Sequence, residues 1–155
     1  MDSGVKNMIR KIWMPCLGLV LFMSGCGGVT SRVHHGTVDT TINQRPDAGR
    51  YLEAIGIGAS DPALLTDTQR KALARDAAIV KAQYEMLSMV KGVTLKGGVK
   101  VERAMETDSS LEATVLDAIR GAEIVKSEFT ADNGCVVTLK LPRARLAKLM
   151  KVEFE

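Results

Sequence analysis

Apolar residues recur every three to four positions between Thr66 and Gly92, and this period predicts a long amphipathic helix. Thr66 and Gln69 have the spacing of a capping box at its start, and Gly92 suits its end. The stripe predicted to face the core is Leu73, Ala77, Val80, Tyr84 and Leu87, widened by Ile79, Met86 and Val90. A run of alanines leaves one side of the helix thin, so that it can lie close to a sheet: Ala72, Ala74, Ala77, Ala78 and Ala82.

The stretch 50–59 alternates large apolar residues with small or polar ones before Asp61-Pro62 breaks it, which predicts a first strand. Its Gly56-Ile57-Gly58 lacks the third glycine of a dinucleotide-binding loop, and Asp61-Pro62 follows where the helix of such a loop should begin. We therefore expect the two glycines to let another backbone pass close by.

Residues 93–101 have a period of two and predict one long strand, kinked or bulged at Gly97-Gly98. The alternative is a hairpin. With a two-residue loop, however, Leu95 would lie opposite Lys100 and the apolar and polar faces would mix.

Ser109 and Glu112 have capping-box spacing before a short helix that ends at Gly121, with an inward stripe of Leu111, Val115, Ala118 and Ile119. A hairpin is predicted over 122–131 and 135–141. A two-residue turn would pair Phe129 with Thr138. We favour a three-residue loop with Gly134 in the left-handed region, which pairs Phe129 with Val137 and Val125 with Leu141.

A terminal helix is predicted from Pro142, with Leu146, Leu149 and Met150 facing inward. Its outward cations are Arg143, Arg145, Lys148 and Lys151. They form a solvated face or, in a second interpretation, contact acidic head groups, peptidoglycan or a neighbouring subunit. The predicted order is strand, helix, strand, helix, hairpin, helix. This order is typical of an α+β fold with helices packed on one face of a mostly antiparallel sheet.

The N-terminal segment has a different pattern. Basic residues Lys6, Arg10 and Lys11 precede an apolar run over 12–23, and Ser24-Gly25 then lead to Cys26. This order predicts a bacterial lipoprotein signal over 1–25, with Met23 where leucine is usual. The run of about a dozen residues would span roughly 18 Å as a helix, which is too short for a bilayer core of about 30 Å. A buried core helix and a plain secretory signal are the alternatives, and Met8 could be the true start.

Cleavage would make Cys26 an acylated N-terminus, and three acyl chains would anchor it stably. In lipoproteins of this class an Asp after the cysteine favours the inner membrane, so Gly27 favours the outer membrane. Residues 26–49 are rich in Gly, Thr, Asn, Asp and Pro and predict a flexible tether. We expect one α+β domain over 50–155.

The net charge and the cysteine and histidine residues argue against several classes of function. The net charge of +3 falls to +1 once three cations and one anion leave with the signal, so nothing favours a nucleic-acid partner. Cys16 lies in the signal and Cys26 carries the lipid, so Cys135 has no disulfide partner and is expected to be a small buried residue. His34-His35 lacks other ligands at metal-site spacing. We expect no catalytic residue, metal, cofactor or small-molecule substrate.

Three segments resemble the Lpp-twenty lipoprotein family, within it the flagellar outer-membrane lipoproteins: 55–58, 74–87 with Gly92, and 119–125. The resemblance covers roughly residues 50–141. It implies an outer-membrane protein that faces the periplasm, forms a homo-oligomeric ring or basal disk with flagellar basal-body proteins, and is needed for motility. No enzymatic residue is implied, so only lipidation at Cys26 is transferred. The alternative function is a general envelope lipoprotein that tethers a periplasmic partner or peptidoglycan.

Overall fold

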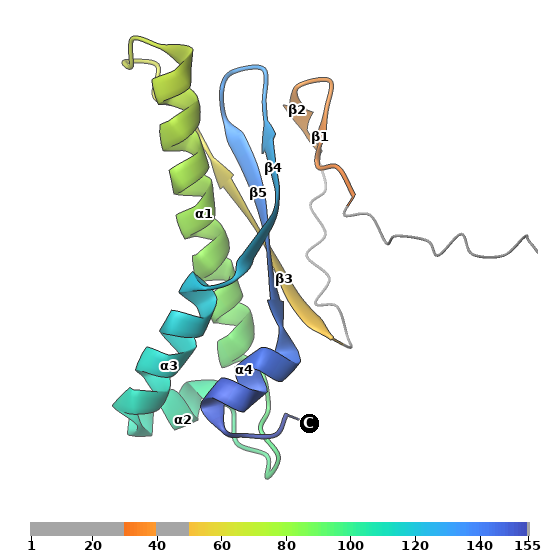
Figure 1. Ribbon diagram of the computed structural model, residues 1–155, viewed down its shortest axis with the longest axis vertical. Helices are drawn as coiled ribbons and strands as arrows, with labels where there is room; N and C mark the ends of the chain where they lie inside the picture. Colours follow the sequence, from red (N-terminus) through yellow and green to blue (C-terminus); the bar gives the residue numbers. More distant parts are fainter. Residues whose placement is uncertain (1–29, 40–49, 155) are drawn as a thin grey trace, which may run out of the picture.

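The computed structural model describes residues 30–39 and 50–154 (Figure 1). Within them the elements are β1 (Val33–His34), β2 (Thr37–Val38), β3 (Tyr51–Gly58), α1 (Asp67–Lys91), α2 (Val101–Thr107), α3 (Ser109–Arg120), β4 (Glu123–Phe129), β5 (Cys135–Pro142) and α4 (Arg143–Met150). This content of helices and small antiparallel sheets confirms the predicted α+β class.

The main sheet has the strand order β3-β5-β4, and both pairings are antiparallel. Strand β5 is central, so both of its edges are paired. Its register with β3 sets Leu52 opposite Leu141 and Gly58 opposite Cys135. Because side chains alternate along a strand, these residues share the face of the sheet that α1 covers in Figure 1.

Two glycines let α1 lie directly on β3. A Cβ atom at Gly56 would lie 2.0 Å from the carbonyl oxygen of Ala78, and one at Gly58 would lie 2.0 Å from that of Ala74. No side chain fits at either position. The expectation that these glycines admit a second backbone is therefore confirmed, and the alanines of α1 supply the thin side that makes the contact possible.

The capping box of Thr66 and Gln69 is confirmed at the start of α1. The predicted inward stripe, however, is wrong for most of its length, because Leu73, Val80 and Tyr84 are 47%, 65% and 63% exposed. Ala74, Ala78 and Ala82 are buried instead, whereas Met86 and Val90, which widen the predicted stripe, are buried as predicted. The physical reason is the close approach at the two glycines of β3, which only the small residues of the helix can meet.

The predicted second strand is also wrong. Residues 95–99 turn back on themselves, with φ of 112° at Gly97 and 79° at Gly98, and Thr94 bridges Lys100. The Leu95 N–H donates to the Val99 carbonyl oxygen at 2.8 Å. The loop therefore has three residues and sets apolar Leu95 opposite apolar Val99. Helix α2, which the sequence did not predict, follows at once and buries Val101 and Met105.

Helix α3 is confirmed with a different cap. Asp108 is the N-cap, and its carboxylate accepts from the N–H groups of Ser110 and Leu111, so the predicted box of Ser109 and Glu112 is not used. The α3 residues Val115, Ala118 and Ile119 are buried as predicted. Helix α4 begins after Pro142, which is its N-cap. Leu146 and Met150 face inward, but Leu149 is exposed, contrary to prediction.

The β4–β5 hairpin has a three-residue loop, as predicted, displaced by one position. Thr130 N–H donates to the Gly134 carbonyl oxygen, so the loop is 131–133. Asn133, with φ of 65°, takes the left-handed conformation expected of Gly134, and asparagine tolerates it. Phe129 consequently pairs with Cys135 rather than Val137, and a bulge between Ile124 and Lys126 shifts the remaining register away from the predicted pairing of Val125 with Leu141.

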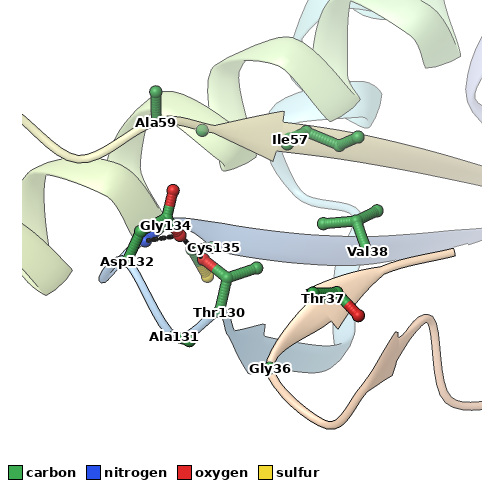
Figure 2. Close-up of a pocket in the computed structure, with 11 residues that line it drawn as sticks. Gly36, Thr37, Val38, Ile57, Ala59, Thr130, Ala131, Asp132, Gly134 and Cys135 are labelled. Carbon is green, nitrogen blue, oxygen red and sulfur yellow. Dashed lines mark hydrogen bonds between the residues drawn. The ribbon is translucent and has the colours of Figure 1, made fainter.

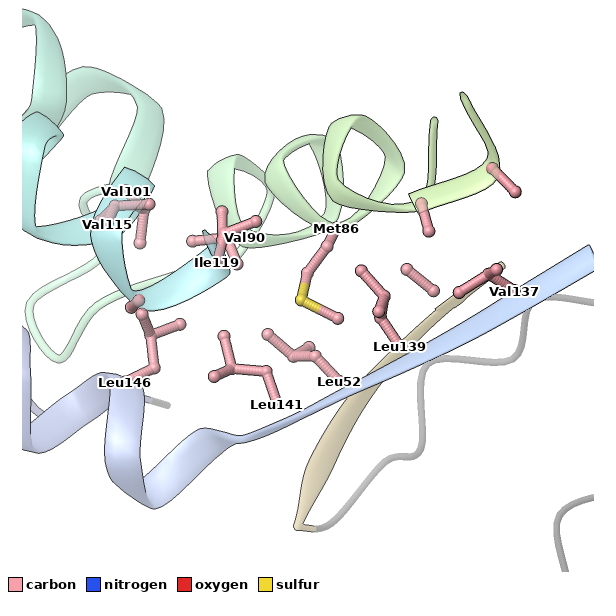
Figure 3. Close-up of a cluster of buried hydrophobic side chains, with 14 of the residues drawn as sticks. Leu52, Met86, Val90, Val101, Val115, Ile119, Val137, Leu139, Leu141 and Leu146 are labelled. Atoms are coloured by element: carbon pink, nitrogen blue, oxygen red, sulfur yellow. The ribbon is translucent and has the colours of Figure 1, made fainter. Parts of the chain in front are cut away.

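Aliphatic side chains fill the core, and methionine and leucine are the largest of them (Figure 3). Met86 from α1 lies over Leu139 of β5, and Leu146 of α4 closes the cluster near Leu141 and Ile119. Cys135 is fully buried, as expected of a small core residue.

Residues 31–39 form a strap that packs on the sheet, and we call them the N-terminal strap. Its strands β1 and β2 pair as a hairpin, Val33 with Val38. The strap lies within the range expected to be a flexible tether, and for these residues that expectation is wrong. The face of the sheet opposite α1 also has buried residues, which are Ile55, Val136 and Thr138.

Candidate functional site

The sequence places the single candidate site at Cys26, which lies outside the described residues, as do the signal segment 1–25 and residues 40–49. What the structure does describe near this site is the N-terminal strap. It begins five residues after Cys26. How it is held to the sheet decides how the folded domain is connected to an anchor at that cysteine.

Glu128 of β4 holds the beginning of the strap. Its carboxylate accepts a hydrogen bond from the Ser31 hydroxyl and another, of 2.9 Å, from the backbone N–H of Arg32. Lys126 lies 3.2 Å from the same carboxylate, whose side chain is only 12% exposed. Arg32 also approaches Glu53 of β3 at 3.8 Å. The strap thus contacts both outer strands of the main sheet through one small network of charges.

The charge state of Glu128 follows from its contacts. Burial raises the pKa of this carboxyl, but the Ser31 hydroxyl, the Arg32 N–H and Lys126 together lower it by more, so that the pKa lies below its ordinary value. Glu128 is therefore ionised near neutral pH. Within the described residues, Arg32 Nε and Thr138 Oγ1 are buried without a hydrogen-bond partner.

The far end of the strap is held by backbone. Ala131 N–H, in the β4–β5 loop, donates to the Gly36 carbonyl oxygen at 2.8 Å. A Cβ atom at Gly36 would lie 2.8 Å from the Cβ of Ala131, so the contact needs glycine. His35 and Gly36 have φ of 50° and 79°, which suits a two-residue type I′ hairpin turn. In the sequence, Gly36 between Val33 and Val38 was the pattern that could have predicted this hairpin.

An open cavity of about 420 Å³ lies between the strap and the ends of β3 and β5 (Figure 2). Its lining includes apolar Val38 and Ile57 as well as Thr130, Asp132 and Cys135. The pKa of Asp132 is lowered by the Thr130 hydroxyl and the Gly134 N–H, so its charge is satisfied by its own loop. Burial raises the pKa of the Cys135 thiol, which disfavours the thiolate that a nucleophile needs.

His34 and His35 are exposed on the strap, and His34 Nε2 lies 3.7 Å from Asp39. Across residues 30–39 and 50–154 no group of three or more potential ligands is arranged to hold a metal ion. On α4, Arg145 donates to the Gly121 carbonyl oxygen at 3.0 Å and Arg143 lies over the Phe154 ring. Lys148 and Lys151 are exposed at the end of this helix.

Comparisons with known proteins give no relative for this chain: no family model, no curated protein and no solved structure matches it. None of the described helices has the length and apolar character needed to cross a bilayer.

Proposed function

We propose that this chain is a non-enzymatic outer-membrane lipoprotein, a structural subunit of a flagellum-associated periplasmic ring or basal disk. The observation that carries the anchoring part is the order of two features. The predicted lipoprotein signal leads directly to Cys26, and a strap that packs on the folded domain begins at Ser31. An acylated Cys26 would therefore be joined to the domain almost directly.

The flagellar part of the proposal rests on the resemblance to outer-membrane lipoproteins of the FlgP kind. An α+β domain with a small antiparallel sheet is compatible with a structural role, because its buried groups serve packing and its loop carboxylates serve turns. The burial of Cys135 supports the absence of nucleophilic chemistry.

Electron cryotomography of flagellar motors tests this role. Cells that lack the protein should lose a periplasmic ring or disk density, and the wild-type gene should restore it. Cys26→Ser should release the protein from the membrane and abolish metabolic labelling with palmitate. Identical motors in both strains would remove the flagellar assignment, and labelling that persists in Cys26→Ser would remove the anchor.

The exposed Lys148 and Lys151 favour a second candidate, a general envelope lipoprotein that tethers peptidoglycan or another acidic partner. Replacing both with Glu should abolish co-sedimentation with peptidoglycan if this candidate is right. Replacing Glu112 and Glu123 with Lys, also at exposed positions, is the matched control.

A further inference from the structure

The solvent side of α1 carries apolar residues that the described domain leaves uncovered. Leu73, Val80 and Tyr84 are large and about half or more exposed, and Ala77 between them is exposed too. We call these four residues the outer stripe. At 3.6 residues per turn they lie on the side of the helix opposite Ala78 and its buried neighbours. Figure 1 shows α1 at the edge of the molecule, with the sheet on its other side.

The spacing of the outer stripe fits a second helix. Its residues follow one another in steps of four, three and four, and half-buried Leu87 continues with a step of three. An alternation of three and four is the spacing by which one helix packs lengthwise against another in a left-handed pair. The buried side of α1 has steps of four throughout, as suits its contact with the sheet.

Charges beside the stripe indicate which helix fits. Asp76 and Lys81 flank it on its two sides, five residues apart, the spacing at which side chains of two parallel copies meet across the seam. An in-register parallel pair would join each Asp76 to the Lys81 of the other copy. An antiparallel pair would set Asp76 near uncharged Gln83 instead. Asp76 forms no ion pair with any residue that the structure describes, whereas Lys81 already contacts Glu85 at 2.8 Å.

The end of the stripe is also compatible with such a pair. Arg70, three residues before Leu73, would be the next residue of the seam. In a parallel pair it would face Arg70 of the second copy. Its Nε donates to the Leu64 carbonyl oxygen at 2.9 Å, and its Nη1 lies 3.5 Å from Asp67. The guanidinium is thus held by the start of its own helix.

We propose that the outer stripe is the contact with a second copy of this chain, through parallel, in-register packing of the two α1 helices. This inference rests on the proposed function only for the expectation that the protein self-assembles. It names a surface and an orientation for one two-fold contact within that assembly.

Cysteine substitutions made one at a time in the full-length chain, expressed in cells and treated with a mild oxidant, test the proposal. Leu73→Cys and Tyr84→Cys should each form a dimer of twice the monomer mass, because parallel packing brings identical stripe residues within the roughly 4.4–6.8 Å between Cα atoms that a disulfide needs. Ala72→Cys, exposed on α1 but off the stripe, is the matched control and should remain monomeric. Buried Cys135 should not compete, and the unsubstituted chain, which keeps Cys16, Cys26 and Cys135, is the control for any dimer that the native cysteines form.

Other patterns of cross-linking would overturn the proposal. In antiparallel packing the two copies of Leu73 would lie about 16 Å apart along the helix, so only a mixture of the Leu73→Cys and Tyr84→Cys chains would cross-link. No cross-link at either position would exclude the stripe as a self-contact. A product of a different mass would identify another protein as the partner.

Charge reversal gives an independent readout. In the Leu73→Cys chain, Asp76→Lys and Lys81→Asp should each lower the yield of dimer about threefold, and the two together should restore it. Failure of the double variant to restore the yield would contradict parallel packing. Thermal unfolding of each variant should show whether the fold itself is intact.

The size of the native protein separates the two proposals. A large assembly in which the stripe cysteines stay unlinked would overturn this contact and leave the proposed function standing. A dimer linked through the stripe, in cells whose motors are unchanged by loss of the protein, would overturn the flagellar function and leave the contact standing.

Discussion

At the scale of single residues, Glu128 controls the N-terminal strap. Its carboxylate is the shared acceptor for Ser31 and Arg32, and a neutral amide in its place has a single acceptor oxygen. We expect Glu128→Gln to increase amide hydrogen exchange across 31–39 while the exchange of α1 stays unchanged. Glu123→Gln, at an exposed position of the same strand, is the control and should leave the strap protected.

The strap should also be sensitive to acid. Because the pKa of Glu128 is lower in the folded protein than in an unfolded chain, its contribution to stability is full above the ordinary carboxyl pKa of about 4.3 and is lost as the pH falls through that value and below. The charged groups nearest to it are Lys126 and Arg32, and Arg32 also approaches Glu53. The protection factors of the strap amides, which correct each exchange rate for its intrinsic pH dependence, should therefore fall below about pH 4, and constant protection between pH 3 and 7 would contradict the role of Glu128.

Gly56 is the second residue whose role can be tested directly. In Gly56→Ala the new methyl would lie 2.0 Å from the carbonyl oxygen of Ala78, which belongs to a helix backbone and cannot turn aside. We expect a loss of about 3 kcal/mol in the free energy of unfolding, measured by urea denaturation.

Gly92→Ala is the matched control for that measurement. Gly92 has a right-handed conformation, and the nearest atom to an added Cβ would be 3.5 Å away. The substitution should stabilise the protein by about 0.5 kcal/mol, through the unfolded chain. Equal effects of the two substitutions would show that α1 does not lie directly on β3.

At the scale of elements, α1 is a helix with two apolar sides, and the sheet decides which side is buried. Met86→Ala should cost about 2–5 kcal/mol of unfolding free energy, because this fully buried side chain would leave a cavity. Val80→Ala, on the exposed side of the same helix, should change the stability of the isolated protein by less than about 0.5 kcal/mol. A larger loss for Val80→Ala than for Met86→Ala would show that Val80 faces the core, as the sequence predicted.

The segment 93–101 shows why alternation alone did not predict its structure. A continuous strand and a hairpin with a three-residue loop both keep Leu95 and Val99 on one side, and only a two-residue loop separates them. Loop length is set by the positive φ of Gly97 and Gly98 and by the neighbours that the turn meets, including the Leu95–Phe154 bridge. The same limit explains the hairpin of β4 and β5, where Asn133 and Gly134 can each take the left-handed position.

At the scale of the whole molecule, the strap determines how far the domain can stand from an anchored Cys26. With the strap packed on the sheet, the five residues from Cys26 to Ser31 reach at most about 18 Å. If the tether ran unattached from Cys26 to Arg50, as its composition suggests, its reach would be about 85 Å. An anchored domain should therefore lie close to the membrane surface.

Energy transfer between a dye in the membrane and a fluorophore on Ala72→Cys measures this distance in the acylated protein. Insertion of ten Gly and Ser residues after Gly28 should reduce the transfer, because it lengthens the connection before the strap. The same insertion after Asn43, between the strap and β3, should leave it unchanged. Equal reductions would show that the strap does not hold the domain.

Patterns along the chain were enough to predict the α+β class, the capped ends of α1, the inward face of α3, the burial of Cys135 and the need for glycine in β3. Each of these depends on local chemistry: a capping oxygen, a period of side chains, or a missing Cβ. The anchor at Cys26 remains a prediction of the sequence alone.

Contacts between distant segments set the remaining features: which side of α1 is buried, where the chain turns at 95–99, the register of β4 on β5, and the attachment of the strap. These features depend on what each segment meets across space. The glycines of β3 leave room for the alanines of α1 but not for a side chain as large as Tyr84. Glu128 accepts a hydrogen bond from Ser31 although 97 positions separate the two residues. A pattern along the chain contains no information about such a partner, because close packing between distant segments is what selects among locally acceptable structures.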